Sequence, residues 1–386
     1  MTMKNILVSL VSEQTIPNII VAAHYRPDDF WFVSTERMEK ERRVACIENT
    51  LKLKGLLPAS KNIQKVIVDQ DSPSDCMEKI EGLIEKVEDE VEYVVNITGG
   101  NKLMALATYE VFREIGQKVV IDYIPLGKNE LVQIFPRKKP LKTSVIEERL
   151  NLEEYLCCYG FSIQNKNSLE QIRTNAINRR STSHWMFENY VQLKGVLGFI
   201  YKHLGNKRNK NKYSFLETFD RDFAIIEREM LNKFGFEIKD RLIRKAITKD
   251  EIVYLTGGWF EEFVFNGVYD IVQNNILDDA MIGVKIEGLS GSSNDLDIAF
   301  MKDNSFYHVE CKTLGNEEDQ GIIRDEVYKK GAISILLGKG EKRTMICTTQ
   351  SQINESLANR AQDYGIEILT IEQVRNLKNR LKERFV

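Results

Sequence analysis

The sequence predicts an α/β protein: a doubly wound parallel sheet, then a mostly helical middle segment, then an α/β domain with a mixed sheet. Three observations carry this prediction. In the first 140 residues, short runs rich in Val, Ile and Phe alternate with helix-like segments, which is typical of βαβ units. From about residue 148 to 250 the pattern is mostly helical. After residue 251 a helix precedes three strand-like runs and a further α/β segment.

Length and composition exclude several classes of protein. A chain of 386 residues exceeds one ordinary core of about 100 to 200 residues, so two or three domains are expected. With 42% hydrophobic and 29% charged residues it is neither disordered nor fibrous. No apolar run approaches the roughly 18 residues of a membrane span, and none resembles a signal peptide, so we expect a cytoplasmic protein without a membrane partner. Six cysteines without a CxxC pair favour neither a disulfide scaffold nor a zinc ribbon.

Prolines and charge suggest where the chain divides. All seven prolines lie in the first 140 residues, and the basic stretch Pro136 to Lys142 is typical of an interdomain linker. We therefore predict domains at 1–145 and 251–386, joined by a helical, basic region at 146–250. Residues 161–212 carry 10 Lys and Arg and 2 acids, a net charge of +8. Their most basic part, Tyr201 to Lys212, is interpreted as an exposed loop, which could guide a polyanionic backbone or be only a solvated loop.

The elements are expected in the following order. Strands of the first domain are predicted at Asn5 to Val11, Phe30 to Ser34, Lys65 to Asp69, Val91 to Ile97 and Lys118 to Ile124, with helices at Ser74 to Val87 and Asn101 to Ile115. Helices of the middle region are predicted at Trp185 to Leu204 and Phe219 to Phe234. In the last domain a helix at Trp259 to Val272, capped by Thr256, precedes strands near 281–288, 295–301 and 306–312.

Polar residues follow three strands of the first domain, where the carboxyl ends of parallel strands share one edge of the sheet. Glycine at a strand-to-helix turn lets an anion approach the backbone amides, although a Gly-Gly pair also closes tight βα connections. Such a turn is predicted at Thr98 to Lys102. It matches neither a Walker A loop nor a GxGxxG fingerprint, which disfavours triphosphate hydrolysis and NAD binding. The candidate nucleotide-binding residues are Ser12, Gln14, Ser34, Thr35, Met38, Thr98, Gly99, Gly100, Asn101 and Lys102.

A hairpin near residue 304 brings acidic residues together. If Asp303 and Asn304 form a two-residue turn, Asp297 lies opposite Glu310 on one face, while apolar residues pair on the other. Opposed carboxylates repel each other, so this pairing indicates a bound cation such as Mg²⁺ or Mn²⁺. Lys312 projects from the same face, where it could orient a water or stabilise developing charge.

Other residues near the hairpin have weaker interpretations. Glu261, in the first turn of the helix after Gly258, could reach the cation directly or through water. Asp295 is interpreted as an ion partner of Lys312. His308 shares the face of the carboxylates, and we interpret it as a hydrogen-bonding neighbour and not a general base.

Two stretches resemble known families. The run NITGGNKLMA (Asn96 to Ala105), with the Ser12 and Gln14 loop, resembles the CRISPR-associated Rossmann-fold (CARF) sensor domain, in which loops of two subunits hold a cyclic oligoadenylate. The set GxWFE, NxLD and ECK is similar to the PD-(D/E)xK restriction-endonuclease-like nucleases. Together they resemble the two-domain CRISPR ancillary nucleases of type III antiviral defence.

The resemblance implies a homodimeric, metal-dependent nuclease of DNA or RNA or both. It implies Mn²⁺ or Mg²⁺ as cofactor, held by Asp297, Glu310 and Glu261, with Lys312 also catalytic, and a cyclic oligoadenylate activator, with cyclic tetra-adenylate the first ring to test. Two alternatives stay open at this point. One is a sensor module that binds or slowly cleaves the cyclic nucleotide, and the other is a DNA-processing nuclease without second-messenger control.

Overall fold

The computed structural model of the chain describes residues 3–58, 61–87, 90–116, 118–313, 320–336 and 343–386. Its contacts divide into two compact units. One consists of Met1–Ile163, Ile286–Ser293 and Asp303–Phe306, and the other of Gln164–Lys285, Asn294–Lys302 and Tyr307–Val386. This division does not test the three domains expected from the sequence, which remain a prediction.

The amino-terminal unit is built on a seven-stranded sheet of order β3-β2-β1-β4-β5-β6-β7. Strands β1 to β5 pair in parallel, and β6 and β7 add antiparallel strands at one edge. This is the predicted doubly wound parallel sheet. The strands are β1 (Lys4–Leu10), β2 (Asp29–Ser34), β3 (Ile63–Ile67), β4 (Val91–Asn96), β5 (Val119–Tyr123), β6 (Glu130–Phe135) and β7 (Thr143–Val145).

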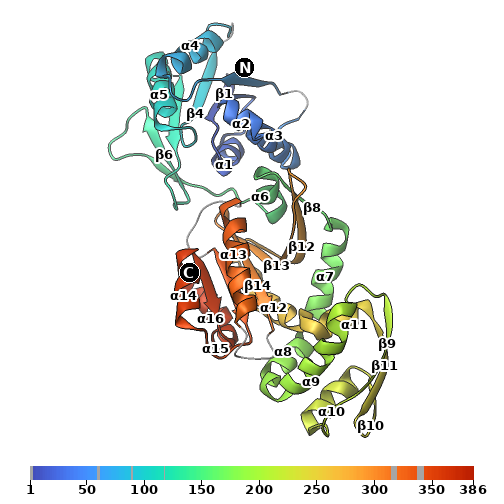
Figure 1. The fold of residues 1–386 in the computed structure, drawn as a ribbon. Helices are drawn as coiled ribbons and strands as arrows, with labels where there is room; N and C mark the ends of the chain where they lie inside the picture. The colour runs from blue at the N-terminus through green and yellow to red at the C-terminus, as the bar shows by residue number, and fades with distance from the viewer. Residues whose placement is uncertain (1–2, 59–60, 88–89, 117, 314–319, 337–342) are drawn as a thin grey trace. The chain divides into compact units, whose positions relative to one another are not determined.

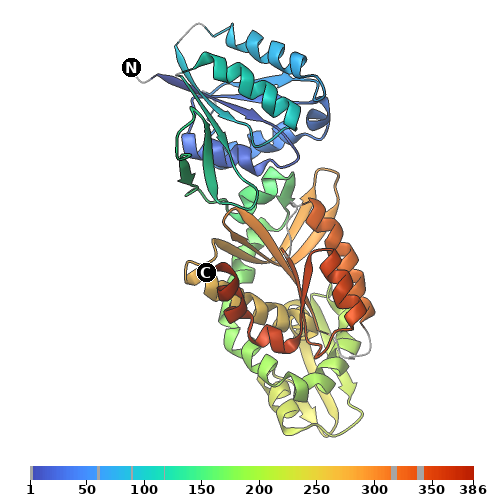
Figure 2. The same ribbon diagram turned by 90° about the vertical axis from the view of Figure 1, so that its left-hand side faces the viewer.

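Helices cover both faces of this sheet. Figures 1 and 2 show α4 and α5 on one face and α1 and α3 on the other. Beneath α4 and α5 lies a core that includes Val8, Ile80, Val95 and Phe112. The helices are α1 (Ile16–Tyr25), α2 (Glu36–Lys40), α3 (Arg43–Leu53), α4 (Pro73–Ile84), α5 (Lys102–Ile115) and α6 (Leu152–Cys158).

The second large sheet has the order β16-β15-β14-β13-β12-β8. It is mixed, as predicted, because β14, β15 and β16 pair in parallel while β12 and β8 pair antiparallel. The strands are β8 (Phe161–Ile163), β12 (Asp279–Gly288), β13 (Ser293–Lys302), β14 (Ser305–Lys312), β15 (Thr344–Thr348) and β16 (Ile366–Leu369).

Two apolar clusters pack on this sheet. One joins Ile323, Val327 and Leu357 to the β15 residue Ile346. The other joins Val309 and Cys347 to Trp259 and to the carboxy-terminal helices. The helices are α12 (Trp259–Gln273), α13 (Gly321–Leu336), α14 (Glu355–Asp363), α15 (Ile371–Arg375) and α16 (Leu377–Phe385).

The middle region is mostly helical but also contains strands that the sequence analysis missed. A three-stranded antiparallel sheet of order β10-β11-β9 consists of β9 (Lys212–Thr218), β10 (Glu237–Lys239) and β11 (Leu242–Thr248). Strand β10 has only three residues, and in β11 only Ile243 and Ile247 are buried, so the alternating pattern was weak. The helices are α7 (Lys166–Asn178), α8 (Arg180–Glu188), α9 (Tyr190–Leu204), α10 (Ile225–Lys233) and α11 (Lys249–Val253).

Several predicted boundaries in this region were wrong. The helix expected over Trp185 to Leu204 is divided at Asn189, and the one expected from Phe219 begins only at Ile225. The basic stretch predicted as one loop starts inside α9 and continues through a short 3₁₀ turn, Gly205–Lys207. None of the helices in the described part of the chain is both long and apolar enough to cross a membrane.

Candidate functional sites

The β13–β14 hairpin has the turn that the sequence predicted. Asp303 and Asn304 both have positive φ, 48° and 59°, as in the two-residue turns that match the twist of paired strands. The rings of Phe300 and Tyr307 stack with centroids 5.0 Å apart. These features fit the predicted pairing, in which Asp297 lies opposite Glu310, the residue before Cys311. Consistent with this, Asp297 Oδ2 accepts a hydrogen bond of 2.8 Å from the Cys311 amide.

Glu310 is buried and contacts two lysines. Lys312 Nζ lies 2.7 Å from Glu310 Oε1, and Lys330 Nζ lies 2.6 Å from Oε2. Lys312 also lies 3.4 Å from Glu326 on α13. The expected partnership with Asp295 is therefore wrong for the described residues: Lys312 turns toward Glu310 and Glu326, while the Asp295 carbonyl accepts a hydrogen bond from Lys330.

The charges of this cluster affect one another. Burial raises the pKa of Asp297 well above its usual range, and the negative charges of Glu261 and Glu310 add to the effect. Burial would also raise the pKa of Glu310, but the charges of Lys330 and Lys312 outweigh it and lower that pKa. Burial would lower the pKa of Lys312, yet Glu310 raises it above the usual lysine value, so this side chain carries a proton at neutral pH. The cluster thus combines neighbouring carboxylates with an ammonium group that is charged at neutral pH.

Glu261 enters the cluster from the start of α12. Burial raises the pKa of Glu261, Arg208 opposes that rise, and the charge of Glu310 adds to it. Thr256 does not cap α12, contrary to our expectation, because α11 runs into α12 through a π-helical turn at Tyr254–Gly258. The Thr256 hydroxyl instead donates to the Ile252 carbonyl at 2.7 Å.

Arg208, like Lys330 and Glu326, is a residue of this site that the sequence analysis did not identify. Its Nε donates to Thr256 Oγ1 at 2.8 Å, and its Nη2 donates to the Thr256 carbonyl. Gly257, at φ 140°, has room for this guanidinium: a Cβ there would lie 3.1 Å from Arg208 Nη2 and 3.6 Å from Thr313 Oγ1. The basic middle region therefore places one arginine beside Gly257, in the turn that leads into α12. The only signal in the sequence was its high positive charge.

The acidic residues of the cluster have the donor chemistry of a divalent-cation site, although they are not arranged as a ready-made one. Within the described residues, no group of three or more His, Cys, Asp or Glu side chains is arranged closely enough to hold a metal. The chemistry of the donors nevertheless fits one, because Glu261, Asp297 and Glu310 are hard oxygen ligands whose mutual repulsion a divalent charge would remove. In the absence of such a charge, lysine ammonium groups neutralise Glu310.

His308 agrees with its interpretation as a hydrogen-bonding neighbour. It is buried, and its Nδ1 lies 3.3 Å from Thr344 Oγ1. Burial, with the nearby charge of Lys330, lowers the pKa of His308 to about 3. The imidazole is therefore neutral at physiological pH and unsuited to exchange protons there.

A second candidate site is a cavity of about 250 Å³ at the carboxyl edge of the first sheet. Six of the predicted nucleotide-binding residues line it: Ser12, Gln14, Thr35, Met38, Gly100 and Asn101. Five residues that we had not proposed complete the lining: Val11, Glu13, Arg37, Gln70 and Met104. Of these, Arg37 forms an ion pair with Glu13. Both follow strands predicted to end at this edge, so their position was a signal that could have identified them.

Of the other four predicted residues, Ser34, Thr98 and Gly99 have structural contacts. Ser34 donates to Glu39 at 2.7 Å, and Thr98 Oγ1 accepts from the Ile124 amide at 2.9 Å. Gly99 packs tightly: a Cβ there would lie 2.2 Å from the Leu10 carbonyl oxygen. Lys102 is exposed at the start of α5 and does not line the cavity.

Asn101 lines the cavity and also caps a helix. Its Oδ1 accepts from the Met104 amide at 2.9 Å, while its Nδ2 donates to the Gln70 carbonyl at 2.7 Å. The glycine turn is therefore held by packing and capping, and it also forms one wall of the cavity.

Comparisons with known proteins give separate matches for the two ends of the chain. Residues 6–155 match the sequence family of the Card1 CARF domain, and residues 248–386 match the Card1-like endonuclease domain. No curated protein matches the chain.

Solved structures share the fold. Can2 from Sulfobacillus thermosulfidooxidans in complex with cyclic tetra-adenylate is 18% identical, with a TM-score of 0.78 over 99% of each chain. The protein VC1899 from Vibrio cholerae is 18% identical, with a TM-score of 0.79 over 99% of this chain and 98% of that one. A type III CRISPR defence DNA nuclease activated by cyclic oligoadenylate is 15% identical, with a TM-score of 0.55 over 90% of this chain and 46% of that one.

The two family matches identify what each end of the chain contains. They lie in the order that the sequence resemblance implied, with the sensor domain first. The cavity lies in the first matched region, and the cluster of Asp297, Glu310 and Lys312 lies in the second. The chain therefore has an amino-terminal CARF domain of the Card1 type and a carboxy-terminal domain of the Card1-like endonuclease family.

Proposed function

We propose that the protein is a metal-dependent nuclease of the PD-(D/E)xK type that a cyclic oligoadenylate activates, in type III CRISPR defence. The observation that carries the nuclease part is that Asp297 on β13 accepts a hydrogen bond from the Cys311 amide, next to Glu310 on β14, while protonated Lys312 contacts Glu310. This cluster lies inside a domain of an endonuclease family. We further propose a homodimer in the cytoplasm, with DNA or RNA or both as substrate.

Glu261, Asp297 and Glu310 would hold Mn²⁺ or Mg²⁺. When bound, such a cation supplies Lewis-acid polarisation of the phosphodiester. Lys312 carries its charge at neutral pH, so it would stabilise the negative charge that develops on the phosphate and would not act as a general base. Arg208 adds a second positive charge near Glu261 and would help to position the strand. These roles account for the mixture of acids and bases in one partly buried cluster.

The cavity of the amino-terminal unit supports the activator part of the proposal. Hydroxyl, amide and guanidinium groups line it, together with Met38 and Met104, which suits an adenine nucleotide. At about 250 Å³ it is smaller than the roughly 300 to 1,000 Å³ of sites for drug-sized ligands. A ring of four adenylates needs more space, so a second copy of the chain would complete the site. Can2, which shares the fold, binds cyclic tetra-adenylate.

One experiment separates this proposal from its alternatives. The protein is incubated with Mn²⁺ and single- and double-stranded DNA and RNA, with and without cyclic tri-, tetra- and hexa-adenylate, and both the polymer and the ring are analysed. If the proposal is correct, the nucleic acid is cleaved only when the activating cyclic oligoadenylate is present. Ring loss without polymer cleavage would favour a sensor module, and equal cleavage without any ring would favour a nuclease that needs no second messenger.

A further inference from the structure

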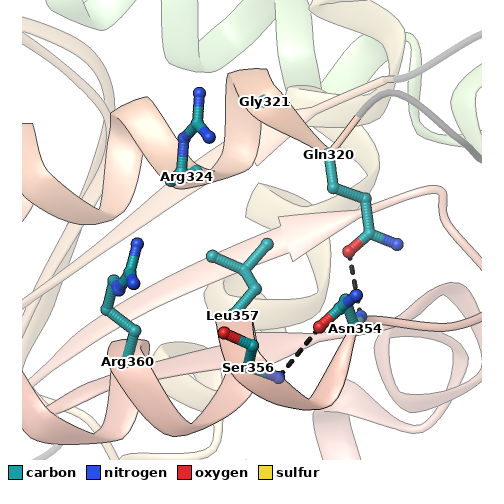
Figure 3. Close-up of a pocket in the computed structure, with 7 residues that line it drawn as sticks. All are labelled: Gln320, Gly321, Arg324, Asn354, Ser356, Leu357 and Arg360. Carbon is teal, nitrogen blue, oxygen red and sulfur yellow. Dashed lines mark hydrogen bonds between the residues drawn. The ribbon is translucent and has the colours of Figure 1, made fainter.

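A pocket of about 660 Å³ lies between the first turns of α13 and α14. Figure 3 shows Arg324 on α13 and Arg360 on α14, with Leu357 between the two helices. The pocket is lined by Gln320, Gly321, Arg324, Asn354, Ser356, Leu357 and Arg360. None of these described lining residues is acidic, so the pocket is positively charged.

The two arginines are available for a ligand. Arg324 is 56% exposed and lies 3.8 Å from the exposed Asp325 carboxylate, a distance at which a surface ion pair contributes little. Arg360 is half-buried, and its guanidinium lies 5.6 Å from the ring centroid of Tyr328. That ring limits the movement of the side chain and leaves its donors to bind an anion.

Hydrogen bonds hold the rim of the pocket in place. The Asn354 amide donates to Gln320 Oε1 at 2.9 Å, which joins the loop before α14 to the start of α13. Gln320 Nε2 in turn donates to the Gln352 carbonyl at 3.1 Å. The pocket is therefore a fixed feature of this end of the two helices and does not depend on two independent surface side chains.

The pocket lies at the same edge of the sheet as the catalytic cluster. Strands β14 and β15 are parallel, and the Thr349 amide donates to the Lys312 carbonyl at 3.2 Å. The chain therefore leaves both strands at one edge before α13 and α14 begin.

Helix α13 separates the pocket from the cluster. Glu326 contacts Lys312, whereas Arg324, two residues earlier, projects from nearly the opposite side of the helix. A helix is about 10 Å wide with its side chains, so a ligand in the pocket would be close to the reacting phosphate but distinct from it.

We propose that this pocket binds a backbone phosphate of the substrate strand, away from the scissile position, with Arg324 and Arg360 as its ligands. The proposal rests on the proposed nuclease function and extends it. A guanidinium group can donate two parallel hydrogen bonds to the oxygens of one phosphate. Such contacts hold a strand in register without reading its sequence. The pocket would therefore contribute to affinity and strand direction, and the acidic cluster would contribute the chemistry.

Salt-dependent binding tests the proposal without cleavage. A labelled single-stranded oligonucleotide is titrated with the full chain in EDTA over a series of salt concentrations, for the parent and for Arg324→Gln/Arg360→Gln. Each lost phosphate contact should reduce the slope of log K against log salt by about 0.7 for a single strand. The loss of affinity should be similar for unrelated sequences. Arg324→Lys/Arg360→Lys should recover most of the slope, because it keeps both charges.

Arg244→Gln is the matched control, since Arg244 is 64% exposed, lies on β11 and pairs with Glu237 on the surface. It removes one surface positive charge, where the double variant removes two, and it does not touch the pocket. Thermal melting of each variant checks that the fold is intact.

A length series of substrates gives the second readout. Oligonucleotides are shortened stepwise on each side of the cleaved bond. The double variant should cleave long strands more slowly than the parent, and the difference should disappear once strands on one side are too short to reach the pocket. Equal slowing at every length, or a salt slope like that of Arg244→Gln, would overturn the assignment. If the parent neither binds nor cleaves any nucleic acid, the proposed function itself fails.

Discussion

Tyr159→Phe tests whether ligand binding in the CARF cavity is coupled to the segment at the end of the amino-terminal unit. The Tyr159 hydroxyl donates a hydrogen bond of 2.8 Å to Oε1 of Gln14, which lines the cavity. The same loop is tied to α6 at Thr15, whose hydroxyl donates to the Cys158 carbonyl at 2.7 Å. Only a few residues later, after Ile163, the chain passes into the second unit. A ligand that contacts Gln14 therefore acts on a residue bonded to this connecting segment.

The expected magnitude follows from the one bond that is lost. Because Tyr159 binds the oxygen end of the Gln14 amide, the nitrogen end is oriented to donate to a ligand. The substitution removes a half-buried hydrogen bond, worth about 1 kcal/mol, and lets the amide rotate. We expect the dissociation constant for cyclic tetra-adenylate to rise about fivefold. The ring contact of residue 159 with Tyr155, centroids 5.1 Å apart, is kept, so the fold should be stable.

A double-mutant cycle decides the mechanism. Calorimetric titrations with cyclic tetra-adenylate are compared for the parent, Tyr159→Phe, Gln14→Ala and the double variant. If Tyr159 acts through Gln14, Tyr159→Phe should have little further effect once Gln14 is alanine, which gives a coupling of about 1 kcal/mol. A fivefold effect that persists in the Gln14→Ala background would refute the reasoning, as would an unchanged dissociation constant in the single variant.

Four further variants test the remaining assignments. Lys312→Ala should abolish cleavage while activator binding, measured by calorimetry, stays intact; a fully active variant would remove the assignment. Asp297→Asn should be at least as stable as the parent in EDTA, because it relieves like-charge repulsion, but should gain less thermal stability from Mn²⁺. An equal gain would show that Asp297 is not a ligand. Arg208→Ala should slow cleavage at least tenfold, as loss of a charge-assisted contact implies, whereas Lys207→Ala in the same segment should not. Gly99→Ala should destabilise the CARF domain by about 3 kcal/mol in urea unfolding, because its Cβ would overlap the Leu10 carbonyl; an unchanged midpoint would contradict that packing.

The sequence predicted those parts of the fold and sites that depend on local pattern. The doubly wound sheet follows from the βαβ alternation, and the hairpin turn follows from Asp303-Asn304 between two alternating runs. The sheet edge also predicted where the cavity would lie, since six of its lining residues follow predicted strands. In each case the residues concerned are close in sequence or are related by a simple register.

Other features depend on contacts between distant residues. Lys330 reaches Glu310 from α13, twenty positions along the chain, and no short motif contains both. Glu326, also on α13, joins Glu310 as an ion partner of Lys312, so Lys312 does not need Asp295. The strands of the middle region were missed for a related reason: they pair with one another at a small separate sheet, and their burial comes from α9 and α10, which the local pattern does not reveal.

Arg208 shows what the middle region adds to the endonuclease domain. Its guanidinium binds Thr256 in the π-helical turn that precedes α12, and that turn positions Glu261. π-Helical turns lack the regular hydrogen-bond ladder, so a side chain that binds the Thr256 carbonyl stabilises a backbone group the helix leaves available. The charge of Arg208 also lowers the cost of keeping Glu261 ionised in its half-buried position. A net charge of +8 in residues 161–212 therefore has a specific structural use at one position, apart from any general attraction for nucleic acid.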